Sequence, residues 1–132
     1  MDLKVFDNFL SQKHYQELVE FMDNSEWYYN SMIVYDHEED PDQYQFVMPI
    51  WAQGWIHQRY LVELFSTYLE PIAWVRIKAN FSPKRNEIIE NELHVDSNHG
   101  DLTGIFYLNS NDGYTHFKGG KRVESVANRM VI

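Results

Sequence analysis

Two stretches in the first half of the chain carry apolar residues at helical spacing. In residues 12–23 apolar side chains recur every three or four positions, and Ser11 immediately before them is a suitable N-cap. A second apolar stripe, at residues 56–69, includes Ile56 and is ended by Pro71, because the residue before a proline is driven away from helical geometry. We therefore expect two amphipathic helices in this half.

The remaining apolar stretches are short and extended in character. Within residues 72–81, Val75, Ile77, Ala79 and Phe81 alternate with other residues and would share one side of a strand. The other strand-like segments are residues 27–35, 44–51, 90–95, 102–108, 114–118, 122–125 and 128–132. Two helices with mixed strands, followed by a run of short strands, predict an α+β fold with a β-sandwich or barrel in the second half.

Composition narrows the class of protein. The 132 residues fit one domain, which we expect to span residues 1–132 without linkers or repeats. Twenty acidic and eleven basic residues give a net charge of −9, which disfavours nucleic-acid binding, and no stretch has the pattern of a membrane span or a leader peptide. Because cysteine is absent, a metal would need histidine and carboxylate ligands. We expect a cytoplasmic protein, and its oligomeric state stays open.

The strongest chemical signal is the segment His94-Val-Asp96. In an extended strand, positions i and i+2 point to the same face, so His94 and Asp96 can both point into one cavity. An imidazole nitrogen and a carboxylate oxygen supply two of the three ligands of a facial triad for Fe(II), which leaves the opposite coordination positions open. The pattern H-x-D alone is common by chance, and taken alone it is better explained as a polar strand end beside a loop.

The residues that follow change this balance. After Asp96 the chain reads Thr103-Gly-Ile-Phe-Tyr107-Leu-Asn109, then a loop with a Gly-Gly turn, then an apolar strand that opens with Asn128-Arg129. This succession, over about residues 72–132, resembles the Fe(II)/2-oxoglutarate-dependent oxygenase superfamily, in particular its compact prolyl-4-hydroxylase-like members. The resemblance implies a jelly-roll core (a double-stranded β-helix) supported by the two N-terminal helices. It also implies a dioxygenase that hydroxylates its substrate with Fe(II) as cofactor and 2-oxoglutarate as cosubstrate.

The resemblance assigns roles to individual residues. It implies that His94 and Asp96 bind the iron and so act in catalysis. It implies that the Tyr107 hydroxyl hydrogen-bonds 2-oxoglutarate, although a buried tyrosine bonded to the backbone is a nearly equal alternative. Asn80 and Phe81 fall at the edge of the implied cavity.

Two family features have no counterpart in this sequence. In the family, a distal histidine ligand and a basic partner for the 2-oxoglutarate C5 carboxylate follow the strand that begins with Asn128-Arg129, whereas the sequence here ends at Ile132. We therefore expect an oxygenase-like domain that lacks its last strands and is metal-poor or inactive unless completed. His99 and His116 are nearby, but we expect both to be loop histidines, and Arg129 to be a surface or rim residue.

Two other classes of protein stay open. One is a non-catalytic β-sandwich that binds a small molecule in an aromatic cavity, and the other is a cupin-like metal protein that does not use 2-oxoglutarate. The aromatic content of 16% suits such a cavity, but it suits a packed core better for most of the rings. The substrate also stays open between a small molecule and a peptide, because residues 37–43 and 82–89 carry no readable specificity signal.

Overall fold

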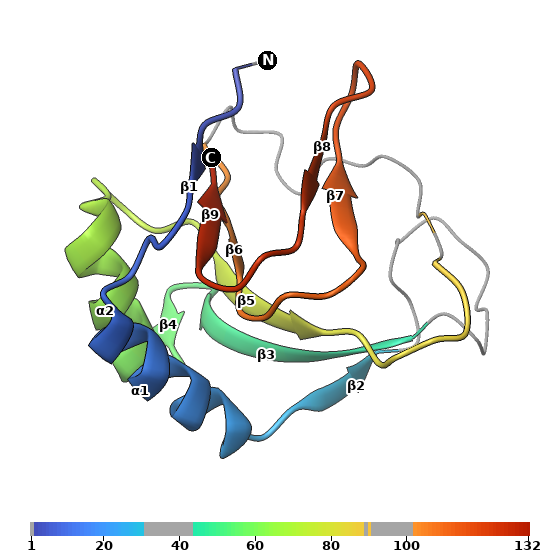
Figure 1. Ribbon diagram of the computed structural model, residues 1–132. Coiled ribbons are helices and arrows are strands. Elements are labelled where there is room, and N and C mark those ends of the chain that lie inside the picture. The colour runs from blue at the N-terminus through green and yellow to red at the C-terminus, as the bar shows by residue number, and fades with distance from the viewer. Residues whose placement is uncertain (1, 31–43, 89, 91–101) are drawn as a thin grey trace. The chain divides into compact units, whose positions relative to one another are not determined.

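The structure is a computed structural model that describes residues 2–30, 44–88, 90 and 102–132 (Figure 1). Across these residues it shows two α-helices and several antiparallel β-sheets. The predicted mixed α+β class, with both helices in the first half of the chain, is therefore confirmed.

The chain forms two compact units. Unit 1 combines Met1–Ser25 with Asn86–Ile132, and unit 2 consists of Glu26–Arg85. Unit 2 is thus inserted in the sequence of unit 1, whose two parts must be joined by contacts between residues about a hundred positions apart. Each unit has its own apolar core, made in unit 1 by Leu10, Leu18, Met22, Val123, Met130 and Val131 and in unit 2 by Met48, Ile50, Leu61 and Leu64.

Helix α1 (Gln12–Asp23) belongs to unit 1 and confirms the first predicted helix. The Ser11 side chain accepts a hydrogen bond from the backbone N–H of His14 at 3.2 Å, which satisfies one of the free donors at the helix start. Leu18 and Met22, four residues apart, are the buried side chains of the apolar stripe.

The sheet of unit 1 joins the beginning of the chain to its end. Strands β1 (Val5–Phe6), β9 (Arg129–Val131) and β6 (Ile105–Tyr107) are antiparallel, in the order β1-β9-β6. The pairing of β1 with β9 is extended by reciprocal backbone hydrogen bonds between Lys4 and Ile132, each 2.9 Å long. Strand β9 is therefore hydrogen-bonded along both edges.

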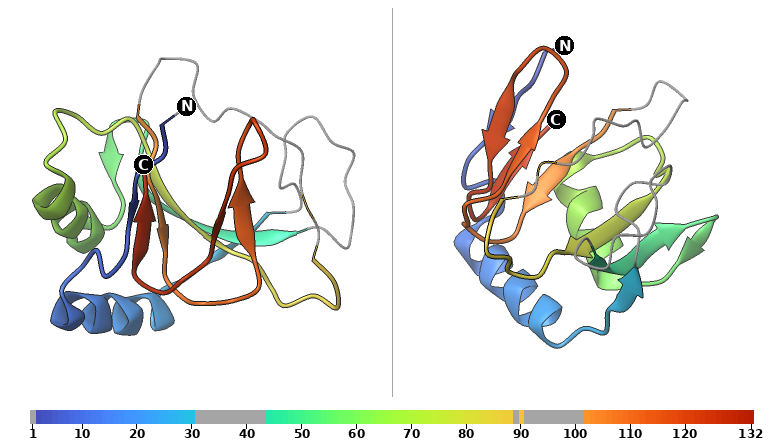
Figure 2. Two further views of the ribbon diagram at one scale, coloured as in Figure 1. Left: turned by 45° about the horizontal axis from the view of Figure 1, so that its top comes forward. Right: turned by 90° about the vertical axis from the view of Figure 1, so that its right-hand side faces the viewer.

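Strands β6 and β9 continue into a second antiparallel pair. The hairpin of β7 (Tyr114–His116) and β8 (Arg122–Glu124) lies between them in the sequence, so the four strands form one long hairpin with nested pairing. Residues 108–113 and 125–128 lead from one pair to the other, as Figure 2 shows. Gly119 at the tip has a φ of 94°, a left-handed conformation that suits glycine.

Unit 2 is built around the long strand β3 (Gln45–Ala52). Strands β2 (Tyr28–Asn30) and β4 (Trp55–Ile56) pair with opposite ends of β3, and β5 (Ile77–Phe81) pairs along most of its length. Because Phe46 is paired with both β2 and β5, these two strands must occupy opposite edges of β3.

Helix α2 (Arg59–Leu69) begins later than the apolar stripe predicts. Ile56 lies in β4 rather than in the helix, because the backbone N–H of His57 donates to the Ile50 carbonyl at 2.8 Å and holds this segment against β3. The end of the helix agrees with the prediction, since Glu70 adopts a left-handed conformation with φ 48° before Pro71.

The strand predicted at residues 72–81 is wrong in its first half. Strand β5 starts at Ile77, and the side chain of Val75 is exposed. Residue Trp74 explains the late start: its carbonyl accepts a hydrogen bond from Trp51 Nε1 at 3.0 Å, and its own Nε1 donates to Ser66 Oγ at 2.9 Å. The segment before β5 is therefore fixed by indole hydrogen bonds instead of a strand ladder.

Asn128 fastens the two sequence segments of unit 1 together. Its side chain is buried, accepts a hydrogen bond from the backbone N–H of Leu10 and donates one to the Leu10 carbonyl, each at 2.9 Å. Its backbone N–H donates to the Tyr107 carbonyl, and its carbonyl accepts from the N–H of Phe9, again at 2.9 Å. With φ at 64°, Asn128 adopts a left-handed conformation that asparagine tolerates better than most residues.

We expect Asn128→Ala to lower the free energy of unfolding by about 2–4 kcal/mol, because two buried groups of Leu10 lose their partner and alanine is strained at a positive φ. Asn128→Gly should recover roughly 1 kcal/mol of this loss, since glycine removes the strain alone. Urea unfolding followed by far-ultraviolet circular dichroism measures the effect in unit 1. Tryptophan fluorescence is unsuitable, because all four tryptophans lie within Glu26–Arg85.

The matched control is Asn8→Ala. Asn8 also has a positive φ, 51°, but its side chain is exposed. This substitution should therefore cost only the backbone strain of about 1 kcal/mol. Equal losses for Asn8→Ala and Asn128→Ala would contradict the role given to the asparagine side chain of Asn128.

Candidate functional site

The two predicted iron ligands, His94 and Asp96, lie outside the described residues, as does His99. Tyr107, the predicted 2-oxoglutarate ligand, is described and lies at the end of β6 in unit 1. His116 is described as well: it lies in strand β7, within the segment predicted as extended at residues 114–118, and so is not the loop histidine that was also expected. The geometry of the candidate site is therefore read from Tyr107 and the strands beside it.

The Tyr107 side chain connects the two strand pairs of unit 1. Its hydroxyl donates a hydrogen bond of 2.6 Å to Oγ1 of Thr115, which lies in the middle of β7. Thr115 is paired across the hairpin with the buried Val123, so this face of the hairpin is the apolar one. The partner of Tyr107 is thus a side chain and not the backbone group that the sequence analysis considered as an alternative.

Partial burial affects the chemistry of Tyr107. Burial raises the pKa of its phenol, and the hydrogen bond to Thr115 opposes this only in part. The group therefore stays protonated at neutral pH. Its single proton is donated to Thr115, so a hydrogen bond from the phenol to an anionic acceptor would require Thr115 to change from acceptor to donor. A neutral, partly buried phenol is suited to hydrogen-bond one oxygen of a carboxylate.

The opposite face of β7 carries Tyr114 and His116, because residues two apart in a strand share a face. Both contact the carboxylate of Glu90: the Tyr114 hydroxyl donates to Oε2 at 2.5 Å, and Nδ1 of His116 lies 3.5 Å from Oε1. The hydrogen bond to Glu90 and its negative charge raise the pKa of Tyr114. Glu90 is the described residue that comes four positions before His94.

The cross-strand neighbours of these two residues complete a polar surface. Arg122 is paired with His116, and its guanidinium carbon lies 4.5 Å from the centre of the Tyr114 ring, a cation–π geometry. Nε of Arg122 also lies 2.9 Å from Oε1 of Glu124, which is paired with Tyr114. Arg122 therefore contacts the face of the Tyr114 ring, while the Tyr114 hydroxyl donates a hydrogen bond to Glu90.

The other residues singled out by the resemblance have structural partners. Arg129 binds Asp7 through Nε at 2.7 Å and donates to the Glu124 carbonyl from Nη1 at 3.1 Å, so its guanidinium joins strand β9 to the N-terminal segment. Asn80 and Phe81 lie in β5 of unit 2, where both side chains are exposed and the Phe81 ring packs near Phe46 with 5.9 Å between ring centres.

The residues fit a ferrous site by the type of their donors. Within residues 2–30, 44–88, 90 and 102–132, no three histidine or carboxylate side chains converge as a metal site would require. A ferrous site in this protein would therefore need donors from outside these ranges, where His94 and Asp96 lie. An imidazole and a carboxylate are the donors that non-haem Fe(II) prefers, and the Tyr107 phenol is a suitable donor for an organic carboxylate.

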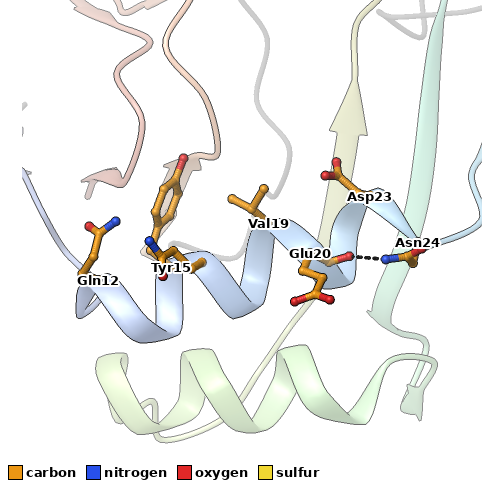
Figure 3. Close-up of a pocket in the computed structure, with 7 residues that line it drawn as sticks. Gln12, Tyr15, Val19, Glu20, Asp23 and Asn24 are labelled. Atoms are coloured by element: carbon orange, nitrogen blue, oxygen red, sulfur yellow. Dashed lines mark hydrogen bonds between the residues drawn. The ribbon is translucent and has the colours of Figure 1, made fainter.

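A shallow depression of about 420 Å³ runs along helix α1. Figure 3 shows that Tyr15, Val19, Glu20 and Asp23 line it from successive turns of the helix. The Tyr15 hydroxyl is engaged with the carbonyl of Leu108 at 2.6 Å, so it supports the end of strand β6. The depression holds carboxylates and amides without a basic or catalytic partner, and it is not the candidate site.

Two residues of the candidate site could not be found from the sequence. Thr115 and Glu90 contact Tyr107 and the hairpin only because of the register of β7 with β8, which the sequence pattern does not fix. The available signal was the alternation Tyr114-Thr115-His116, which predicts that the threonine and its neighbours face opposite sides.

No protein-family model, curated protein or solved structure gives a significant match to the chain. Among the helices that the structure describes, none has the length and apolar character needed to cross a membrane.

We expect Tyr107→Phe to lower the free energy of unfolding at neutral pH by about 1 kcal/mol, the usual loss for one hydrogen bond. Because burial raises the pKa of Tyr107, its contribution is full below the ordinary tyrosine pKa of about 10 and is lost as the pH rises further. The alkaline decrease in stability should thus be shallower in Tyr107→Phe than in the wild-type protein. Urea unfolding between pH 7 and about pH 11 tests this.

Thr115→Val is the matched partner substitution, because it removes the acceptor and keeps the shape of the side chain. The double variant should be no less stable than the worse single variant, since both remove the same hydrogen bond. Strictly additive losses would show that the two hydroxyls act separately.

Proposed function

We propose that the protein is an Fe(II)- and 2-oxoglutarate-dependent dioxygenase of the prolyl-4-hydroxylase-like kind, with a jelly-roll core. His94 and Asp96 are the proposed iron ligands, and Tyr107 is the proposed ligand of 2-oxoglutarate. The support comes from the succession of motifs in the sequence and from the position of Tyr107 in the structure.

The observation that carries the proposal is the protonated, half-buried Tyr107 hydroxyl beside the hairpin that also binds Glu90. Thr115 holds the hydroxyl on one face of β7, and Tyr114 and His116 hold the Glu90 carboxylate on the other. The four residues from Glu90 to His94 reach at most about 14 Å when fully extended. In the sequence, His94 therefore comes four residues after a side chain that is bound to β7.

Each residue has a task that its chemistry permits. His94 and Asp96 would bind ferrous iron through an imidazole nitrogen and a carboxylate oxygen, and Tyr107 would donate a hydrogen bond to a carboxylate of 2-oxoglutarate. When bound, these two groups supply the oxidation: dioxygen gives one atom to succinate, formed with loss of carbon dioxide, and one to a C–H bond of the substrate. The protein orients the bound groups and keeps water away from them.

Anaerobic binding of Fe(II), with and without 2-oxoglutarate, tests the proposal. We expect iron binding to be strengthened by 2-oxoglutarate, with a visible charge-transfer band when both are present, and succinate to be released on exposure to air. His94→Ala and Asp96→Ala should abolish the band, because each removes an iron ligand. Tyr107→Phe should weaken 2-oxoglutarate binding roughly tenfold to a hundredfold, the range for a hydrogen bond to a charged group.

His57→Ala is the control, because the His57 side chain is exposed and lies in unit 2. It should leave iron and 2-oxoglutarate binding unchanged. Iron binding that ignores 2-oxoglutarate would instead favour a cupin-like metal protein. Iron content that survives both the His94 and the Asp96 substitution would refute the oxygenase.

A further inference from the structure

The hydrogen bond between Tyr107 and Thr115 joins the two strand pairs of unit 1. Tyr107 ends β6, which pairs with β9, and Thr115 lies in the middle of β7, which pairs with β8. The two hydroxyl oxygens are 2.6 Å apart, and both side chains are half-buried. An anion that took the proton of the phenol would therefore act on the contact that links one strand pair to the other.

The chemistry of the two hydroxyls allows this hydrogen bond to reverse. Each hydroxyl has one proton to donate and two lone pairs that can accept. The phenol of Tyr107 donates in the structure, and Oγ1 of Thr115 accepts. If Tyr107 donates to an anion instead, the Thr115 hydroxyl can turn about its Cβ–Oγ1 bond and donate to Oη of Tyr107. The two oxygens stay in contact, so the junction between the strand pairs is kept.

The backbone near Thr115 is fixed by groups other than Tyr107. Ser125 donates from its backbone N–H to the carbonyl of Gly113 at 3.0 Å and from its hydroxyl to the carbonyl of Asn109 at 2.9 Å. Only the two hydroxyl protons therefore need to move. We propose that Thr115 is a positioning residue for Tyr107, which accepts the phenol proton in the free protein and donates its own proton when Tyr107 binds an anion.

A reversed bond would also strengthen the interaction of Tyr107 with the anion. A phenol that donates to an anion has a more negative oxygen and accepts more strongly, so hydrogen bonds linked in this way reinforce one another by about 10–30% each. Ionisation of Tyr107 imposes the same reversal, because a phenolate has no proton to donate. Burial raises the pKa of Tyr107, and the hydrogen bond of Thr115 opposes this rise, as a donor to the phenolate does.

The pKa of Tyr107 tests the reversal without any ligand. The ¹³Cζ signal of Tyr107, identified by its absence in Tyr107→Phe, is followed by nuclear magnetic resonance from about pH 8 to the onset of alkaline unfolding. Thr115→Val should raise the pKa further, because the phenolate loses its donor, and Thr115→Ser should keep the wild-type value. The charges of Arg129 and Glu124, which also act on this phenol, are the same in all variants.

The sign of this change decides the question. If Thr115 served only as an acceptor, its loss would destabilise the neutral phenol, and the pKa of Tyr107 would fall in Thr115→Val. A lower or unchanged pKa in this variant would therefore overturn the reversal.

The affinity for 2-oxoglutarate tests the positioning role, which rests on the proposed function, whereas the reversal does not. It is measured without oxygen in the presence of Fe(II). Thr115→Val should weaken binding by about twofold to tenfold, the range for a hydrogen bond that its neighbour strengthens, and Thr115→Ser should restore it. Thr67→Val is the matched control: the Thr67 hydroxyl donates to the Glu63 carbonyl in unit 2, and its loss should change neither measurement.

The outcomes separate the two proposals. Tighter binding in Thr115→Val would show that Thr115 competes with the ligand for the phenol proton, and unchanged binding would show that it does not assist; either result would overturn the positioning role. A wild-type protein that binds no 2-oxoglutarate would remove the proposed function. The titration of Tyr107 would still decide whether its hydrogen bond with Thr115 reverses.

Discussion

The structure of unit 1 depends on the hydrogen bonds of one buried side chain, Asn128. Its amide binds both backbone groups of Leu10, 118 residues earlier in the sequence, and so closes a loop that contains all of unit 2. Closing a long loop costs chain entropy, but this cost grows only slowly with the length of the loop. An inserted unit of this size is therefore tolerated. The pairing of β1 with β9 adds to the closure, because β9 begins at the residue after Asn128. The Asn128 hydrogen bonds and the β1–β9 pairing together attach the N-terminal part of unit 1 to its sheet.

The same junction reaches the candidate site. The backbone N–H of Asn128 donates to the carbonyl of Tyr107, while the hydroxyl of Tyr107 donates to Thr115. Tyr107 is therefore held at both ends, by its carbonyl in the sheet and by its phenol on the hairpin. A side chain fixed in this way loses little conformational entropy on binding a ligand, which is the advantage of a preorganised site. Fold and site thus share one set of hydrogen bonds.

Local signals in the sequence predicted the elements that local interactions decide. Helix α1 has the predicted bounds because its N-cap and its apolar stripe lie within one segment. Ile56 and Val75 were placed wrongly because distant groups decide their conformation: the Ile50 carbonyl holds β4, and two indole groups hold the segment around Trp74. The prediction of His94 and Asp96 as iron ligands stays a prediction, since both lie outside the described residues. The mixed α+β class could be predicted from the sequence. The jelly-roll topology stays a prediction.

The contacts of Glu90 and Tyr107 could not be predicted, because they depend on strand register. Alternation along β7 sends Thr115 to one face and its two neighbours to the other. A shift of one residue in the pairing of β7 with β8 would exchange these faces, which would turn Thr115 toward Glu90 and place Tyr114 and His116 beside the buried Val123. Burying polar side chains without partners is costly, which favours the register in which Tyr107 meets the Thr115 hydroxyl and Glu90 meets Tyr114 and His116. The core of unit 1 and the polar surface of its hairpin are thus specified together by the alternation along β7 and β8.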